Sequence, residues 1–253
     1  MDNMIFGIRP VMEAIETGKQ IEKVYLRHGA DGELLHQLVR LIKQHGIFVQ
    51  WVPVERLNRF TQKNHQGVVA MCAAVELADF ETVAERIIQT IENPLVIILD
   101  GVTDVRNFGA IARSAECAGA QAVIMPAKGA APVNADAVKT SSGALNIIPV
   151  CRVPNLKAAV FYLKSAGFQI IASTEKAEKF YYDVDYVKPT AIIMGAEDTG
   201  ISRTNLELCD EHVKIPICGK INSLNVSAAA SILMFEAVRQ KQQVTEARIN
   251  LII

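Results

Sequence analysis

Three polar stretches of the sequence carry side chains suited to chemistry. The first contains Asn107 and Arg113, the second contains Glu197, and the third contains Ser223 and Asn225. Amides, hydroxyls and carboxylates orient a substrate by hydrogen bonds, and the planar guanidinium of an arginine suits a phosphate group. The ordinary alternative for an asparagine before an apolar helix is a cap on that helix. Position within the whole chain has to decide between these interpretations.

Each of the three stretches follows a predicted strand. Leu95–Asp100 and Thr190–Gly195 are apolar runs that precede the first and second stretches, and residues 213–217 precede the third. Helices are predicted at 107–118 and 225–239. This alternation indicates a parallel sheet covered on both faces, and ligands bind beyond the carboxyl ends of such strands. We therefore expect the three stretches to lie close together.

The composition limits the classes of protein that fit. With 253 residues, of which 50% are hydrophobic and 6% aromatic, the chain can build one large or two smaller aliphatic cores. Five scattered cysteines without a CxxC pair argue against a disulfide framework or a zinc site, so no metal is expected. A net charge of −1 restricts nucleic-acid binding to local patches. Without a long apolar run or a signal peptide, we expect a soluble cytoplasmic protein.

The chain is predicted to hold two domains. Residues 1–75 form a small α/β unit, with 9 Lys and Arg against 7 Asp and Glu, and 94–253 form a larger one, with a strand at 147–150. Residues 76–93, capped by Asp79, are a linker or the first packing element of the larger domain. The stretch 55–67, between two predicted strands, is basic, rich in amides and carries one aromatic residue. We have no prediction for 242–253.

Two common enzyme classes are disfavoured. A dinucleotide fold needs GxGxxG after its first strand and an acid about 20 residues later, whereas Gly101 and Gly109 lack that spacing. The next strand ends at Pro126 without an acid, which also disfavours the usual Rossmann-type methyltransferase. Ser173 and Ser202 do not lie on the GxSxG elbow of an α/β-hydrolase.

Together the three stretches resemble the motifs of the SpoU (TrmH-like) family of RNA 2′-O-ribose methyltransferases. The matching segments are Asn107-Phe-Gly-Ala-Ile-Ala-Arg113, then 193–200, then 215–227, in order within 95–241. The start of the chain, at 7–11 and 65–68, is similar to the ribosomal-protein-like RNA-binding domain of some members. The family commonly has proline two residues before the asparagine, where this chain has Val105. That departure bears on the subgroup and on the target nucleotide.

The resemblance implies a fold, a cofactor and partners. The implied fold class is α/β, with a C-terminal parallel-sheet catalytic domain tied into a deep trefoil knot and preceded by a small RNA-binding domain. S-adenosylmethionine is the implied cofactor, and the implied assembly is a homodimer with its active site near the interface. The implied substrate is a guanosine of 23S rRNA. The alternatives are a tRNA substrate and a non-catalytic RNA-binding protein on the same fold.

The resemblance also assigns residues. The catalytic set is Asn107, Arg113, Glu197, Ser223 and Asn225. The resemblance implies that Arg113 either activates the hydroxyl or binds the adjoining phosphate, and we favour the phosphate because a guanidinium stays protonated and is a poor base. The expected cofactor-binding residues are Ser173, Thr174, Gly195, Gly200, Ile215, Ile217 and Leu224. The expected RNA-binding residues are Arg9, Arg56, Arg59, Lys63 and Arg106, for which a solvated face is the alternative.

Overall fold

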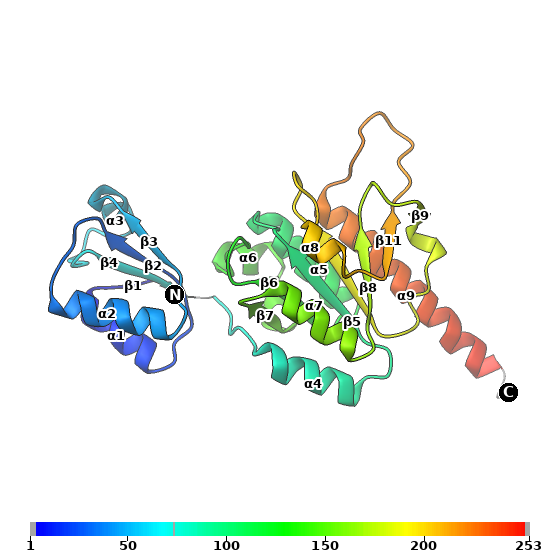
Figure 1. Cartoon of the computed structure of the whole chain (residues 1–253), viewed down its shortest axis with the longest axis horizontal. Coiled ribbons are helices and arrows are strands. Elements are labelled where there is room, and N and C mark those ends of the chain that lie inside the picture. Colours follow the sequence, from blue (N-terminus) through cyan, green and yellow to red (C-terminus); the bar gives the residue numbers. More distant parts are fainter. Residues whose placement is uncertain (1–3, 73, 251–253) are drawn as a thin grey trace. The chain divides into compact units, whose positions relative to one another are not determined.

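The computed structural model describes residues 4–72 and 74–250, with the side chains of 248–250 left aside. The chain divides into two compact units, Met1–Glu76 with Pro132–Ala135, and Leu77–Ala131 with Asp136–Ile253. Each unit has its own sheet and its own covering helices (Figure 1). Within the described ranges, no helix has the length and apolar character needed to cross a membrane.

The first unit is a four-stranded mixed sheet with helices on both faces (Figure 1). Its strand order is β1-β4-β2-β3. Alternation along the strands places Val24 and Val68 in a core with α1 and α2, and Tyr25 and Val69 in a second core with α3. The elements are β1 Met4–Phe6, α1 Ile8–Glu16, β2 Ile21–Arg27, α2 Glu33–Gln44, β3 Val49–Val52, α3 Val54–Phe60 and β4 Val68–Cys72.

Helix α3 lies in the stretch 55–67, for which no secondary structure was predicted. The helix begins after Pro53 and ends at Phe60, and only 61–67 form an irregular connection. The sequence signal was weak because α3 contributes only Leu57 and Phe60 to the core on this side of the sheet. Seven residues are too few to establish a helical period.

The second unit is a seven-stranded sheet in the order β7-β6-β5-β10-β8-β11-β9, and every pairing is parallel. Its strands are β5 Leu95–Asp100, β6 Ala122–Pro126, β7 Val150–Val153, β8 Gln169–Ser173, β9 Lys179–Phe180, β10 Thr190–Gly195 and β11 Glu211–Lys214. Its helices are α4 Phe80–Thr90, α5 Val105–Cys117, α6 Ala135–Thr140, η1 Ala144–Asn146, α7 Leu156–Ser165, η2 Tyr181–Asp183, α8 Arg203–Leu206 and α9 Val226–Asn250.

Both faces of this sheet are buried, as the aliphatic strands predict. Val96 and Ile98 of β5 join a core with residues of α4 and α7. The intervening residue Ile97 and its neighbour Ile192 are also fully buried. Helix α4 therefore packs on the larger unit through Val83 and Ile87, and its N-cap is Asp79, whose carboxylate accepts from the Thr82 amide at 2.9 Å.

Two predicted strands are misplaced. The strand expected at 147–150 lies instead at Val150–Val153, and Ile147 is 70% exposed. The strand expected at 213–217 ends at Lys214. A proline lies in each predicted run, Pro149 and Pro216, and proline has no N–H to donate to a ladder.

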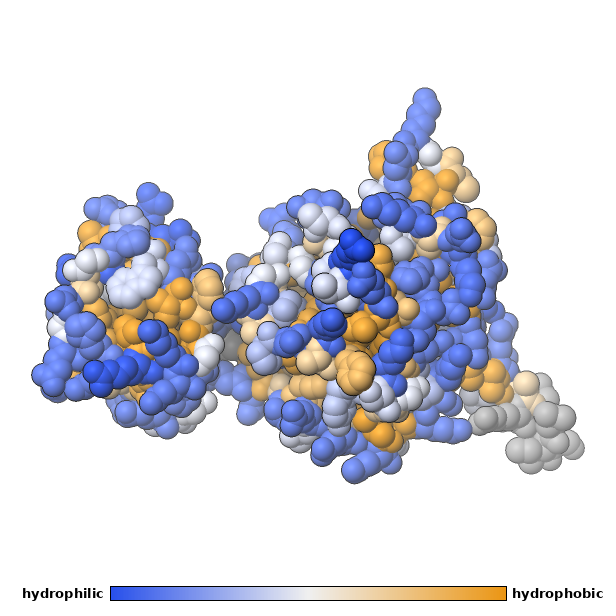
Figure 2. Space-filling view, viewed as in Figure 1, coloured by the Kyte–Doolittle hydropathy of each residue, from blue (hydrophilic) through white to orange (hydrophobic). Residues whose placement is uncertain are grey.

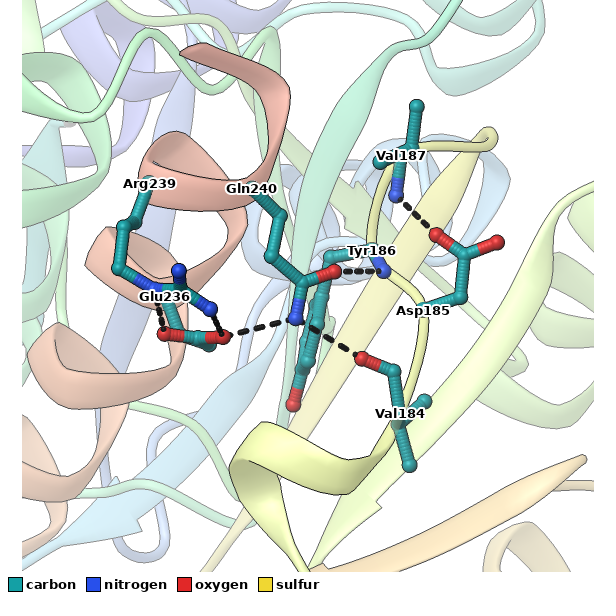
Figure 3. Close-up of polar contacts among 7 residues, drawn as sticks. All are labelled: Val184, Asp185, Tyr186, Val187, Glu236, Arg239 and Gln240. Carbon is teal, nitrogen blue, oxygen red and sulfur yellow. Dashed lines mark hydrogen bonds and ion pairs between the residues drawn. The ribbon is translucent and has the colours of Figure 1, made fainter. Parts of the chain in front are cut away.

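The crossover between β8 and β10 is held to α9 by hydrogen bonds (Figure 3). The Gln240 side chain accepts from the Tyr186 backbone amide at 2.9 Å and donates to the Val184 carbonyl at 3.0 Å. It also donates to Glu236, whose carboxylate accepts from Arg239 at 2.6 and 2.8 Å. This network fixes α9, which reaches Asn250 and thus exceeds the predicted 225–239. Residues 251–253 of the tail lie outside the described residues.

Candidate active site

A hydrogen-bonded cluster joins the three polar stretches. Asn107 donates from Nδ2 to Glu197 Oε1 at 2.5 Å, and Asn225 donates from Nδ2 to Asn107 Oδ1 at 2.9 Å and to Glu197 Oε1 at 3.1 Å. The three residues come from the first turn of α5, the loop after β10 and the residue before α9. Parallel pairing of β5 with β10, with Gly195 opposite Asp100, brings the first two loops to one edge. The expected convergence of the stretches is observed.

Asn225 has both of the roles considered for it. Its Oδ1 accepts from the Ser227 amide at 2.9 Å and from the Ser227 hydroxyl at 2.5 Å, which makes it the cap of α9. Its Nδ2 remains available to donate to Asn107 and Glu197. The cap therefore fixes the direction in which the amide enters the cluster.

Asn107 is not the helix cap. Asp104 has that role, because its carboxylate accepts from the backbone amides of Arg106 and Asn107 at 2.8 Å each. Helix α5 therefore begins at Val105, two residues earlier than predicted. The side chain of Asn107 is left free to bind Glu197 and Asn225.

An open cavity lies beside the cluster, between the ends of β8 and β10 and the loop that follows β11. Its lining includes all seven predicted cofactor positions, together with Glu197 and Ser223 of the predicted catalytic set. The complete lining is Ser173, Thr174, Glu175, Met194, Gly195, Ala196, Glu197, Gly200, Ile215, Ile217, Asn222, Ser223, Leu224, Val226 and Ala229. Six lining residues were not predicted as site residues: Glu175, Met194, Ala196, Asn222, Val226 and Ala229. The signal that could have found them is their position at the ends of β8 and β10, in the loop before α9 and in the first turn of α9.

Gly195 is required by the backbone of the chain itself. A Cβ at this position would lie 2.1 Å from the Gly200 carbonyl carbon and 2.2 Å from the Ile201 nitrogen. The sequence suggested that the close approach would be to a ligand, whereas the structure shows it to be to residues 200–201. Ala196 and Gly200 exchange backbone hydrogen bonds at 3.1 and 2.9 Å, which closes the loop that carries Glu197.

Asp100 anchors the same loop and was not predicted as a site residue. Its Oδ2 accepts from the Ser202 amide at 2.8 Å, the Ser202 hydroxyl at 2.6 Å and the Asn205 side chain at 3.0 Å. The acid at the end of β5 therefore holds the far end of the loop after β10. The sequence showed an acid at a strand end but not its partners, which are 102 and 105 residues away.

Arg113 lies outside the cluster. It is exposed on α5, does not line the cavity, and has no hydrogen bond or ion pair to any residue that the structure describes. Six residues along a helix turn the side chain by about 120° from Asn107. The neighbouring Ser114 accepts from the Ser231 hydroxyl at 2.8 Å, so the side of α5 that carries Ser114 faces α9.

A second cavity shares Glu197 as a wall. It is lined by Gly101, Val102, Thr103, Asp104, Asn107, Ala196, Glu197, Asp198 and Val226. The cluster thus lies between two hollows, one of which holds the predicted cofactor positions. Across the described ranges, no three His, Cys, Asp or Glu side chains gather as a metal site would require.

The predicted RNA-binding residues are all exposed, but they do not form one surface. Arg56 and Arg59 lie on α3, and Lys63 lies just after it. Arg9 lies on α1, which covers the opposite face of that sheet. Arg106 belongs to the second unit, in the first turn of α5.

The loop between β11 and α9 projects from the second unit and shows hydrophobic surface (Figures 1 and 2). Ile221 is 78% exposed, and Ile217 and Leu224, which line the cavity, are also exposed. Apolar side chains this open are typical of surfaces that bind a ligand or a partner.

Sequence comparison assigns both units to one family. Residues 94–235 match the SpoU rRNA methylase family, and residues 4–78 match the RNA 2′-O ribose methyltransferase substrate-binding domain. A Staphylococcus epidermidis protein named for the TrmH family of tRNA/rRNA methyltransferases is 35% identical over 97% of this chain and 98% of its own length. The chain belongs to the SpoU methylase family.

Solved structures agree with this assignment. The SpoU methyltransferase AviRb from Streptomyces viridochromogenes, in complex with the cofactor AdoMet, is 27% identical over 95% of this chain and 90% of its own, with a TM-score of 0.60. An AdoMet-bound rRNA methyltransferase from Sinorhizobium meliloti is 26% identical over 93% of this chain and 86% of its own, with a TM-score of 0.60. The predicted fold class is confirmed: a parallel α/β sheet of the trefoil-knot family, preceded in the chain by a small N-terminal domain.

Proposed function

We propose that this chain transfers a methyl group from S-adenosylmethionine to a ribose 2′-hydroxyl of RNA. The observation that carries the proposal is the Asn107–Glu197–Asn225 cluster beside a cavity lined by all seven expected cofactor positions. Membership of the SpoU family supports the reaction class, and relatives solved with AdoMet support the methyl donor.

The cavity has the chemical character that this cofactor requires. Met194, Ile217 and Leu224 offer apolar walls to a flat base, whereas Ser173 and Thr174 offer hydroxyls to its polar parts. The bound cofactor would supply an already activated sulfonium methyl. The main task left to the chain is to align the acceptor hydroxyl and to accommodate its proton.

Glu197 orients the acceptor in this proposal. Its Oε1 is occupied by the two asparagine amides, and no other hydrogen bond to its carboxylate is present among the described residues. The second oxygen is therefore available to a ribose hydroxyl in the neighbouring cavity. Ser223 completes the wall on the cofactor side.

Arg113 binds the phosphate next to the acceptor ribose. Its guanidinium stays protonated at ordinary pH, so it positions the backbone and is a poor base. A phosphate oxygen oriented by Arg113 then accepts the hydroxyl proton. Arg113 points about 120° away from Asn107 around α5 and makes no contact with the cluster. The proposal therefore needs the Arg113 of a second chain or a shift of α5.

We infer a homodimer with the site near its interface, which answers this need. Phe235, on α9, is 48% exposed, and α9 packs against the helix that carries Arg113. Mixing Arg113→Ala chains with Asn107→Ala chains tests the arrangement. Activity should return if each site takes Arg113 from one chain and Asn107 from the other, and a mixture as inactive as its components would place both residues in one chain.

The proposed substrate is a guanosine of 23S rRNA, held by residues 1–75 while 94–253 carry the transfer. The substrate-binding match at 4–78 supports the first assignment and the rRNA methylase match supports the second. A tRNA is the alternative, because the relatives are named for both RNAs. A cytoplasmic location stays a prediction.

Labelled S-adenosylmethionine provides the test. Purified chain incubated with rRNA or tRNA transcripts should place the label on a ribose 2′-oxygen, and Arg113→Ala should abolish transfer while RNA affinity largely survives. A chain that binds RNA yet transfers no methyl group to either RNA, and does not bind the cofactor, would instead be an RNA-binding protein on this fold.

A further inference from the structure

One face of the first unit gathers aromatic rings and cations. This surface, called here the α3 face, is the side of the four-stranded sheet on which α3 packs. It carries Phe6 of β1, the buried Tyr25 of β2, Phe48 just before β3, and Phe60 of α3. A single helix of seven residues covers it, whereas two longer helices cover the opposite face.

Cations lie over these rings. Lys23 Nζ is 5.0 Å from the centroid of the Phe48 ring and 5.6 Å from that of Tyr25, over which the Arg56 guanidinium also lies at 5.6 Å. Lys63 Nζ is 5.8 Å from the centroid of the Phe6 ring. The only other such contact in the described ranges belongs to the second unit. The α3 face therefore combines stacking surfaces with positive charge.

The charge of this region suits a phosphate backbone. Residues 54–64 carry Arg56, Arg59 and Lys63 against the single acid Glu55. Phe48 is 39% exposed beside edge strand β3, so its ring is accessible from solvent. Aromatic rings interleaved with cations are the means by which proteins bind unpaired nucleic acid.

A stacked base can displace these cations. A cation over an exposed ring contributes roughly two- to fivefold to an equilibrium. A nucleobase stacked on a protein ring contributes roughly five- to 150-fold to affinity. Once a base takes the place over the ring, the released lysine or arginine can contact the neighbouring phosphate. Bases within a duplex already stack on one another and do not offer their faces.

We propose that the α3 face binds an unpaired segment of the RNA, with bases stacked on Phe48 and Phe6 and with Lys23, Arg56 and Lys63 on its phosphates. The proposal rests on the proposed function in taking RNA as the substrate. It adds the structural class of RNA, the residues that stack on it, and the exclusion of Arg9 from this surface.

A pair of exposed aromatic residues allows a matched test. Phe48 lies on the α3 face, and Trp51, which is 43% exposed, pairs with Leu26 and faces the other way. Binding of the full chain to a short unpaired oligonucleotide and to a blunt-ended RNA duplex is measured by fluorescence anisotropy. Phe48→Ala should weaken binding of the unpaired RNA by about fivefold or more. Trp51→Ala should change it by less than about twofold, and neither variant should alter binding of the duplex.

A second pair of variants tests the charge. Arg56→Gln with Lys63→Gln should weaken binding of the unpaired RNA and reduce the slope of log affinity against log salt by about 1.4. Arg40→Gln with Lys43→Gln removes two exposed charges from α2, on the opposite face, and should leave the slope unchanged. Circular dichroism and melting temperature establish that all four variants fold.

Equal losses from Phe48→Ala and Trp51→Ala, or wild-type binding by Phe48→Ala, would overturn the proposal. So would an equal loss of affinity for the duplex and for the unpaired RNA. These results are separate from methyl transfer. If the chain transfers no methyl group but Phe48→Ala weakens its binding of unpaired RNA, the proposal for the α3 face stands and the proposed function fails.

Discussion

The amide of Asn225 donates to Asn107 Oδ1 over 2.9 Å, although the two residues are 118 positions apart. The same amide reaches Glu197, while the Asn225 oxygen caps α9. One side chain therefore ties the start of the last helix to both of the other motifs. The site is held by the same contact that begins the helix, and the two roles can be separated by substitution.

Asn225→Ser should separate capping from activity. Serine caps a helix as well as asparagine does, so stability should change by less than about 0.5 kcal/mol, but serine has no amide to donate to Asn107 and Glu197. Methyl transfer should fall about tenfold or more, since the loss of one oriented hydrogen-bonding group at a site has effects of this order. Asn225→Ala removes the cap as well and should cost about 0.5–2 kcal/mol of stability. Chemical denaturation and labelled methyl transfer measure the two effects, and equal stability of the two variants would contradict the capping role.

Gly195→Ala should damage the cofactor cavity. Its Cβ would lie 2.1 Å from the Gly200 carbonyl carbon and 2.2 Å from the Ile201 nitrogen, and both of these atoms belong to backbone that cannot turn aside. We expect a loss of about 1–3 kcal/mol in the free energy of unfolding, together with weaker binding of S-adenosylmethionine by calorimetry. Gly219→Ala is the control, because nothing lies within 4 Å of its added Cβ. A Gly195→Ala variant as stable as the control would show that the loop relaxes freely.

Val105→Pro should be tolerated and should stabilise the chain. Val105 is the first residue of α5, a position that favours proline because its amide needs no helical partner. The preceding Asp104, with φ −75° and ψ 125°, already has the extended conformation that proline demands. We expect a gain of about 0.4–1 kcal/mol in denaturant unfolding, from the lower entropy of the unfolded chain. Val105→Ala should show no such gain, and a loss of stability in the proline variant would contradict the assigned helix start.

Acid should release the network that fastens α9. Hydrogen bonds from Arg239 hold the pKa of Glu236 below its ordinary value of 4.5, and its side chain is only 7% exposed. Because the folded chain binds this proton less readily than the unfolded chain, the stabilisation is complete above pH 4.5 and is lost as the pH falls through the folded value. Glu236→Gln should therefore flatten the pH dependence of the melting temperature below 4.5. An unchanged profile would show that Glu236 is not the responsible group.

Much of the second unit could be predicted from local pattern. The aliphatic runs at Leu95–Asp100 and Thr190–Gly195 specified buried parallel strands because a strand covered on both faces has no need of polar alternation. The site edge followed from the rule that ligands bind beyond the carboxyl ends of such strands. Errors arose where short-range signals conflict, as at Pro149 and Pro216, whose apolar neighbours resemble a strand that proline cannot continue.

The sequence by itself determined the site residues that hydrogen-bond with one another, Asn107, Glu197 and Asn225, and the cavity positions, because their types and order follow a family pattern. Only the tertiary structure decided which groups they meet. It assigned the α5 cap to Asp104, made Gly195 a requirement of residues 200–201, gave Asp100 its partners, and left Arg113 outside the cluster. These relationships join residues distant in the chain, and the packing of whole strands and helices, which no local pattern encodes, sets the distances between them.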